Sequence, residues 1–247
     1  MAVESGKKEQ ASGPERDEVQ EDHLFVMARE MAIEIFEQGR TKEGALELAA
    51  RALRFADRVI EDFESREPLS EPLACKAGCC YCCFYQVYLT PLEAFLIFHH
   101  VDKTYSRQEK LDFMDRIEKT LERTEGKSLE ERALTRRETP CIFLAKGRCS
   151  VYPVRPFVCR ALHSLSGDAC KKALESNSRL VEVEGYAHRY DIFMTVKAGV
   201  EQVCKDRGCQ VDTLLMARAM KRCLEDPSLS EAWMKGRGVV PAGFVPA

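Results

Sequence analysis

Cysteine is the residue type in this sequence whose spacing most directly indicates chemistry. Five of the 12 cysteines lie within nine residues of the stretch ACKAGCCYCCFYQVYLTPLEA, which begins at Ala74, and three more lie between Pro140 and Ser164. Thiolate is a soft, charged ligand that suits zinc, copper(I) and iron–sulfur clusters, and two cysteine-rich segments often build one such site. The spacing therefore predicts a metal centre formed by two segments. The eight candidate ligands are Cys75, Cys79, Cys80, Cys82, Cys83, Cys141, Cys149 and Cys159.

The same two segments lack acidic residues. No Asp or Glu occurs from Pro72 to Leu92 or from Thr139 to Gly167, although the whole chain has 40. The cations within these segments include Lys76, Lys146, Arg148, Arg155 and Arg160. Four thiolates around a dication leave a net negative charge, so missing carboxylates and nearby cations favour the thiolate form. We therefore expect lowered cysteine pKa values.

Arg155 and Arg160 are candidates for positions just outside the metal ligands. There they could neutralise the centre or bind an anionic substrate beside it. Alternatively, Arg155 and Pro156 only fix a turn. His163, four residues after Cys159, is a candidate to replace one thiolate, although a lone histidine is more often structural or exposed.

Simple burial of thiols is the main alternative to metal binding. The two segments hold seven of the chain's 20 aromatic residues, and free cysteine is itself often buried. Burial alone, however, does not explain five thiols within nine residues. The remaining cysteines are Cys170, Cys204, Cys209 and Cys223; we interpret most of them as buried thiols, with Cys204 and Cys209 as reserve ligands.

The composition is that of an ordinary soluble protein. Charged residues make up 31% and the formal net charge is −3, which differs from the polycations that bind nucleic acid, so we expect no nucleic-acid partner. The first 22 residues lack the apolar run of a secretory signal, and no apolar stretch approaches the roughly 20 residues of a membrane span. We therefore expect a cytoplasmic protein without a membrane partner. In that reducing compartment disulfides or thiol redox chemistry are less favoured than metal binding. No protein partner can be named from the sequence.

The paired motifs resemble those of the YkgJ-type cysteine-cluster family, also described as the CxxCxxCC or zinc- or iron-chelating domain. The resemblance covers residues 75 to about 165 and includes CKAGCCYCC, the following VYLTPLEA and PCIFLAKGRCSVYPVRPFVCR. It implies that the metal ligands are Cys75, Cys79, Cys82, Cys83, Cys141, Cys149 and Cys159, with the motif residues Tyr152, Arg155, Pro156 and Arg160 nearby. The chain differs from the shortest form of the motif by three residues between the first two cysteines and by Cys80, which remains an optional ligand.

The resemblance implies a bound zinc or iron centre. Seven cysteines exceed the four that one zinc ion needs, so they could form two zinc sites or ligate one 4Fe-4S cluster with thiols to spare. Surplus vicinal thiols slightly favour the cluster, because a plain zinc knuckle has no use for them. Which member of each adjacent pair binds the metal stays open, since neighbouring side chains point apart in extended backbone.

Helices are predicted to position these cysteines. We expect a mainly α protein whose helices hold an irregular cysteine-rich metal-binding module with one short β-hairpin. The predicted regions are a disordered tail (1–22), a helical arm (23–70), the cysteine-cluster domain (71–170, with a helical insertion over 93–138), C-terminal helices (171–236) and a second tail (237–247).

Local signals give the boundaries of several helices. Asp22 and Thr41 are predicted N-caps, and Thr90-Pro91-Leu92-Glu93 has the form of a capping box that starts a helix directly after the first cysteine segment. Helices are also expected over 106–124, 128–138, 184–207, 211–225 and 229–235. The helix over 106–124 is expected to pack through Leu111, Met114, Ile117 and Leu121. A hairpin is expected over 142–152, with its turn at Lys146-Gly147.

Three functions fit this pattern. The first is chelation of zinc or of iron as an iron–sulfur cluster. The second is a redox or transferase enzyme that acts at the cluster, with Arg155 and Arg160 orienting a substrate, and the third is a zinc-stabilised interaction adaptor. Neither GxGxxG, GxxxxGK[ST] nor GxSxG is present, which disfavours the dinucleotide, ATP and hydrolase sites built on those loops.

Overall fold

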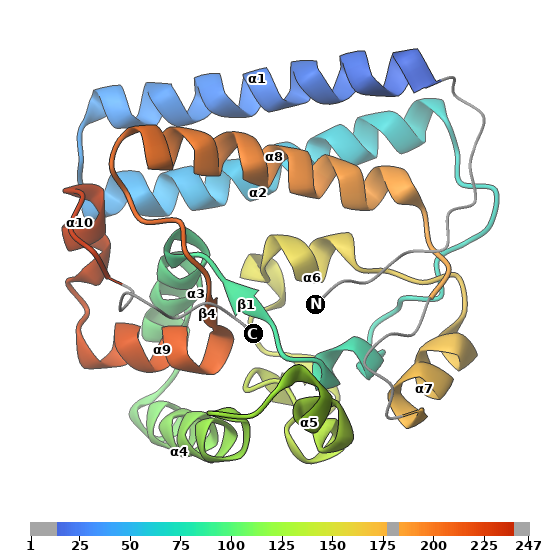
Figure 1. Ribbon diagram of the computed structural model, residues 1–247, viewed down its shortest axis with the longest axis vertical. Helices are drawn as coiled ribbons and strands as arrows, with labels where there is room; N and C mark the ends of the chain where they lie inside the picture. Colours follow the sequence, from blue (N-terminus) through green and yellow to red (C-terminus); the bar gives the residue numbers. More distant parts are fainter. Residues whose placement is uncertain (1–13, 177–182, 240–247) are drawn as a thin grey trace.

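The protein is mainly α-helical, as predicted. The computed structural model describes residues 14–176 and 183–239, and for residues 14–22 the backbone alone. This part of the chain contains ten α-helices and two short two-stranded sheets (Figure 1). None of these helices combines the length and apolar character needed to cross a membrane. Residues 1–13 and 240–247 of the predicted tails lie outside the described residues.

Three long helices form one layer of the molecule (Figure 1). They are α1 (Pro14–Gln38), α2 (Lys42–Arg66) and α8 (Ala187–Asp206). Helix α1 begins before Asp22, so the prediction of Asp22 as its N-cap was wrong. Thr41 caps α2 as predicted, and its hydroxyl accepts a hydrogen bond from Gly44 N at 3.0 Å. Gly199 lets α1 and α8 approach closely, because a Cβ there would lie 2.7 Å from the carbonyl oxygen of Phe25.

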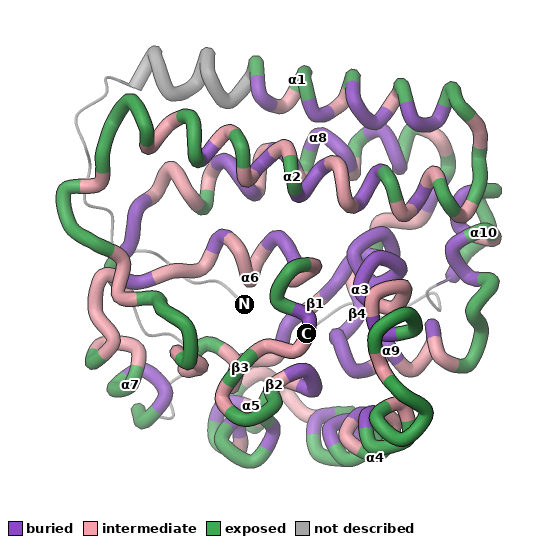
Figure 2. The backbone as a smooth tube through the Cα atoms, turned by 180° about the vertical axis from the view of Figure 1, so that it is seen from behind, coloured by how far each residue is buried: buried purple, intermediate pink, exposed green. Residues whose placement is uncertain are grey.

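A second group of helices packs beneath this layer. It contains α3 (Pro91–Thr104), α4 (Arg107–Thr124), α5 (Leu129–Leu134), α9 (Met216–Glu225) and α10 (Leu229–Met234). Figure 2 shows that α3 is mostly buried, whereas the cysteine-rich loop before it is of intermediate or full exposure. Trp233 of α10 packs edge-on against Phe95 of α3, with ring centroids 5.8 Å apart. Helix α3 is thus at the centre of the core.

The buried face of α4 differs from the predicted one. Ile117 and Leu121 are buried as expected, but the Leu111 side chain is 58% exposed. Phe113 takes its place and stacks on Phe143 with ring centroids 5.0 Å apart. The aromatic contact with the second cysteine segment selects this face, and the sequence of the helix alone does not reveal it.

Two short strand pairs complete the fold. β2 (Leu144–Ala145) and β3 (Arg148–Cys149) form the predicted hairpin, whose turn residues Lys146 and Gly147 have φ values of 50° and 73°. Consecutive positive φ angles suit the twist of a two-residue hairpin. The other pair, β1 (Tyr88–Leu89) with β4 (Leu214–Leu215), joins segments distant in sequence and was not predicted. Because residues 214–215 form β4, α9 begins at Met216 rather than near the predicted residue 211.

Two short helices follow the hairpin. They are α6 (Phe157–Ala161), which contains Cys159, and α7 (Gly167–Glu175), which contains Cys170. Neither was predicted. Helix α6 packs against α8, so the long-helix layer supports the second cysteine segment from behind. Helix α7 packs against η1, a 3-10 helix over Tyr81–Phe84 in the first cysteine segment.

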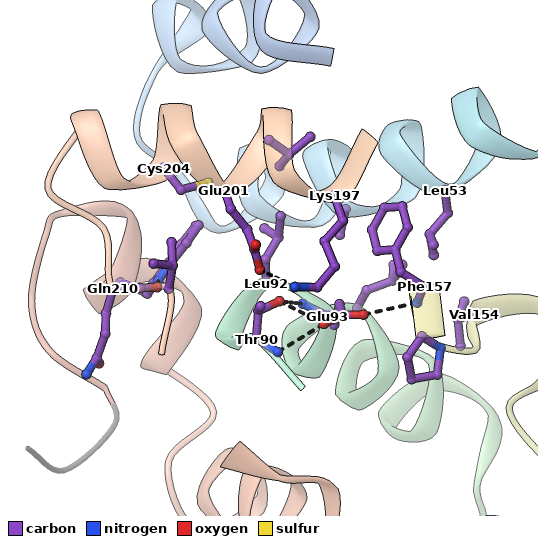
Figure 3. Close-up of a pocket in the computed structure, with 16 residues that line it drawn as sticks. Leu53, Thr90, Leu92, Glu93, Val154, Phe157, Lys197, Glu201, Cys204 and Gln210 are labelled. Atoms are coloured by element: carbon purple, nitrogen blue, oxygen red, sulfur yellow. Dashed lines mark hydrogen bonds and ion pairs between the residues drawn. The ribbon is translucent and has the colours of Figure 1, made fainter. Parts of the chain in front are cut away.

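Glu93 connects the start of α3 to the start of α6. Its carboxylate is buried, with 6% of the residue exposed. One carboxylate oxygen accepts hydrogen bonds from Thr90 N and Thr90 Oγ1, both at 3.0 Å, which completes the predicted capping box of α3. The other oxygen accepts a hydrogen bond from Phe157 N at 3.0 Å (Figure 3). A single side chain therefore caps α3 and fixes the start of α6, two residues before Cys159.

Replacement of Glu93 is expected to destabilise the protein. Glu93→Gln offers only one acceptor oxygen in place of two, so a buried N–H at Thr90 or Phe157 loses its partner, at a cost of about 1–3 kcal/mol. Glu109→Gln is a matched control, since Glu109 completes a capping box at the exposed start of α4 without a third partner. Urea unfolding of the two variants measures the difference. An equal loss in both would show that the bond to Phe157 contributes nothing.

Candidate metal centre

The first cysteine segment folds into two tight turns rather than an extended strand. Cys79 N donates to Lys76 O at 2.9 Å, and Cys83 N donates to Cys80 O at 2.9 Å. The second turn continues into η1. This bending meets the condition under which adjacent cysteines can face a common centre.

Two backbone hydrogen bonds join the first segment to the second. Ala74 N donates to Ser164 O at 2.9 Å, and Cys141 N donates to Cys83 O at 2.6 Å. One bond therefore lies just before the first cysteine of the segment and the other directly at its last. The structure thus places the two cysteine-rich stretches side by side, although helices α3, α4 and α5 separate them in sequence.

Cys82 interacts electrostatically with thiols of both segments. Burial is the main cause that raises the pKa of these cysteines, and a negative charge on Cys82 raises it further. The cysteines affected by Cys82 are Cys75, Cys80, Cys141, Cys149, Cys159 and Cys170. Cys82 itself forms a hydrogen bond with Cys83. All the predicted ligands except Cys79 therefore interact with Cys82, and Cys79 interacts with Cys75 and Cys80.

The expectation of lowered cysteine pKa values was wrong for six of the candidate ligands, whose pKa values are all raised: Cys75, Cys80, Cys82, Cys141, Cys149 and Cys159. Burial raises the pKa of Cys141 to about 11 and holds that of Cys159 well above its ordinary value. For Cys82, the hydrogen bond with Cys83 and burial both raise the pKa. The reason is that the desolvation of thiolates and their mutual repulsion outweigh the nearby cations. Without metal, these thiols are therefore protonated at neutral pH.

The thiols do not form a finished coordination sphere. Among the described residues, no three Cys, His, Asp or Glu side chains are arranged so that they could hold a metal ion. All 12 cysteines are free thiols. The donor set nevertheless fits zinc or an iron–sulfur cluster, since it consists of soft ligands on two adjacent segments. Coordination requires the thiols to lose their protons and move together.

Arg155 interacts electrostatically with two of the thiols. Its positive charge opposes the increase in the pKa of Cys82 and of Cys149. The guanidinium carbon lies 4.3 Å from the centroid of the Tyr152 ring. Its Nε is buried and has no hydrogen-bond partner in the described part of the chain. Arg155 therefore keeps one buried donor available next to the thiols.

Arg160 has a different set of contacts. Its Nη1 pairs with Asp57 of α2 at 2.6 Å, and its Nε donates to Arg155 O at 3.1 Å. Its Nη2 donates to Pro153 O. These contacts anchor the turn around Arg155 to the long-helix layer, so Arg160 positions the segment that carries Arg155. No local pattern in the sequence indicates Asp57 as its partner.

His163 is engaged elsewhere. Its Nδ1 lies 2.8 Å from Ala161 O, and its Nε2 accepts a hydrogen bond from Tyr186 N at 2.6 Å. Burial is the main cause that lowers the pKa of His163, which favours the neutral ring. Both ring nitrogens are used, so the interpretation of His163 as a ligand loses support.

Sequence reasoning missed Cys170, which interacts with Cys75, Cys79 and Cys82. The predicted reserve ligands lie elsewhere: the cysteine that influences Cys204 is Cys209, and Cys209 forms a hydrogen bond with the backbone of Gly236. The signal that could have indicated Cys170 is its place 11 residues after Cys159, close to the end of the acid-free segment.

A small cavity lies next to Glu93, between α3 and α8. It has a volume of about 20 Å³ and is lined mainly by apolar side chains, with Glu93, Lys197 and Glu201 among them (Figure 3). Lys197 and Glu201 form an ion pair at 2.5 Å, and burial is the main cause that raises the pKa of Glu201. This volume suits a water molecule rather than a substrate. We therefore interpret the cavity as part of the packing behind α6.

Comparisons with known proteins gave no match. No protein-family model matches the chain, and neither a curated protein nor a solved structure is significantly similar to it. The assignment of a function therefore depends on the arrangement of the cysteines.

Proposed function

We propose that this protein binds zinc, or iron as an iron–sulfur cluster, through the cysteines of its two adjacent segments. The observation that carries the proposal is the pair of backbone hydrogen bonds, Ala74 to Ser164 and Cys83 to Cys141, which bring the two segments together around Cys82. The proposed ligands come from Cys75, Cys79, Cys82, Cys83, Cys141, Cys149 and Cys159, with Cys80 as an additional candidate. The resemblance to the YkgJ-type cysteine-cluster family supports the same ligand set.

Electrostatics explains why such a site would need a cation. Thiols placed this close together repel one another once ionised, and burial adds to the cost of the charge. A bound dication or cluster iron removes this cost, since metal binding replaces the thiol protons. Arg155 contributes in the same direction at Cys82 and Cys149.

The number of thiols favours more than one metal ion. A closed zinc site uses four cysteines, and a 4Fe-4S cluster also uses four. The two segments supply eight, so two zinc ions or a cluster with remaining thiols both fit the donor count. We prefer an iron–sulfur cluster, because a zinc knuckle has no use for adjacent cysteines beyond its four ligands, whereas spare thiols are useful beside a reactive cluster.

A second candidate function is a redox or transferase activity at the centre. It rests on Arg155, whose buried Nε lacks a hydrogen-bond partner in the described part of the chain. Such a donor suits an anionic group that approaches the thiols. A reducible centre with an open coordination position would favour this candidate over a purely structural one.

The metal content of the protein is the direct test. Full-length protein purified without oxygen is expected to contain zinc, or iron with acid-labile sulfide and visible absorbance. Cys82→Ser combined with Cys149→Ser should abolish most of this metal, because Cys82 interacts electrostatically with thiols of both segments. Cys223→Ala is the control, since Cys223 is buried in α9 and outside both segments. A wild-type protein that is folded, colourless and metal-free after anaerobic purification and reconstitution would disprove the proposal.

Replacement of Arg155 tests its electrostatic role. Arg155→Met should weaken metal binding by roughly 10–100-fold in a chelator competition, as is typical for residues just outside the ligands. Arg155→Lys should recover part of the loss, because it restores the charge. Arg148→Met removes an exposed cation of the same segment and serves as the control. If the Met variants at positions 155 and 148 bind metal equally well, the role of Arg155 is only to fix the turn.

A further inference from the structure

We propose that Cys170 of α7 is an additional thiolate ligand of this metal centre. The inference rests on the proposed metal-binding function and extends it to a third segment of the chain. The metal would be zinc or cluster iron, as for the other thiols. Cys170 lies outside both cysteine-rich stretches and outside the motif that they form.

Ser164 holds Cys170 next to the first cysteine segment. Ser164 is buried, and its carbonyl oxygen accepts the hydrogen bond from Ala74 N at 2.9 Å. The thiol of Cys75 bonds to the backbone of Ser164, and the thiol of Cys170 bonds to its side chain. One buried residue therefore bonds to both thiols.

The position of Ser164 is itself well determined. Its hydroxyl donates to Ser166 O at 2.9 Å and accepts a hydrogen bond from Ser166 N at 3.0 Å. Ser166 then caps α7, where its hydroxyl accepts a hydrogen bond from Ala169 N at 3.1 Å. The start of α7 is thus locked to Ser164, and α7 packs against η1. Cys170 therefore lies on a helix that is tied by hydrogen bonds to Ser164 and packed against the first cysteine segment.

Cys170 also differs from the other cysteines outside the two segments. Its neighbours include Cys75, Cys79 and Cys82, and its side chain is only partly buried. The three remaining cysteines are fully buried, and no thiol of the two segments affects them. These three are Cys204, Cys209 and Cys223.

With Cys170 included, the thiols fall into two groups that meet at Cys82. Cys75, Cys79 and Cys170 form an outer group linked by mutual electrostatic interactions, and Cys75 and Cys170 also bond to Ser164. Cys141, Cys149 and Cys159 form an inner group linked in the same way. Together with Cys80, Cys82 and Cys83, these six thiols provide enough ligands for two four-cysteine centres. Cys170 supplies the ligand that completes the outer group, and each thiol that ligates releases its proton to solvent.

Protection from alkylation tests the contact directly. Reduced full-length protein is treated with iodoacetamide after loading with Zn²⁺, or with Fe²⁺ and sulfide without oxygen, and again after removal of the metal with a chelator. Cys170 should be alkylated much more slowly in the loaded protein, in parallel with Cys75 and Cys79. Protection of Cys75 and Cys79 with unchanged alkylation of Cys170 would overturn the inference and leave the proposed function intact.

A substitution provides the second readout. Cys170→Ser keeps the hydrogen bond to Ser164 but removes the soft ligand, so helix content should be unchanged. Chelator competition should show a loss of affinity beyond the roughly 10–100-fold expected for a residue outside the ligands, or the loss of one metal equivalent. Cys209→Ser is the matched control, because Cys209 also has a hydrogen bond, to the backbone of Gly236, and no thiol of the two segments is among the causes of its pKa shift.

The possible outcomes separate the two proposals. Wild-type affinity and metal content in Cys170→Ser would overturn the role of Cys170, and so would an equal loss in Cys209→Ser. A wild-type protein that takes up no metal under either loading condition would overturn the metal-binding function itself, and the inference with it.

Discussion

The buried carboxylate of Glu93 is the interaction on which the rest of the structure depends. It accepts hydrogen bonds from the backbone N–H groups at the start of α3, in the middle of the core, and at the start of α6, which contains Cys159. A buried carboxylate is costly unless it is fully hydrogen-bonded, and here three donors meet that requirement. The second cysteine segment is therefore held by a buried side chain of the core, whereas the first is held by backbone hydrogen bonds to Ser164 and Cys141.

The arrangement of the thiols disfavours their charged, deprotonated form. Their pKa values are raised by burial and proximity, which is the opposite of what a count of nearby charges indicates. Deprotonation of these thiols would create negative charge that one adjacent arginine does not balance, so a bound cation would complete the charge balance. Arg160 acts indirectly, because it links the turn that carries Arg155 to Asp57 on α2.

The sequence predicted the features that depend on neighbouring residues. The capping box at Thr90–Glu93, the N-cap at Thr41 and the hairpin turn at Lys146-Gly147 all follow local rules, and the structure confirms them. The bond from Phe157 to Glu93, the pairing of β1 with β4 and the approach of Cys170 to Cys75 join distant segments, so no local pattern reveals them. The sign of the cysteine pKa shifts was wrong because desolvation depends on burial, which the list of charges does not contain.

The backbone hydrogen bond between Cys83 and Cys141 closes a long loop of the chain that contains α3, α4 and α5. A metal bound from both segments would keep the ends of this loop together even after the helices have opened. Closure of a loop of this length in the unfolded chain corresponds to about 4 kcal/mol of conformational entropy. In its loaded form the centre would then act as a cross-link, so the protein's resistance to unfolding would follow the metal supply of its surroundings.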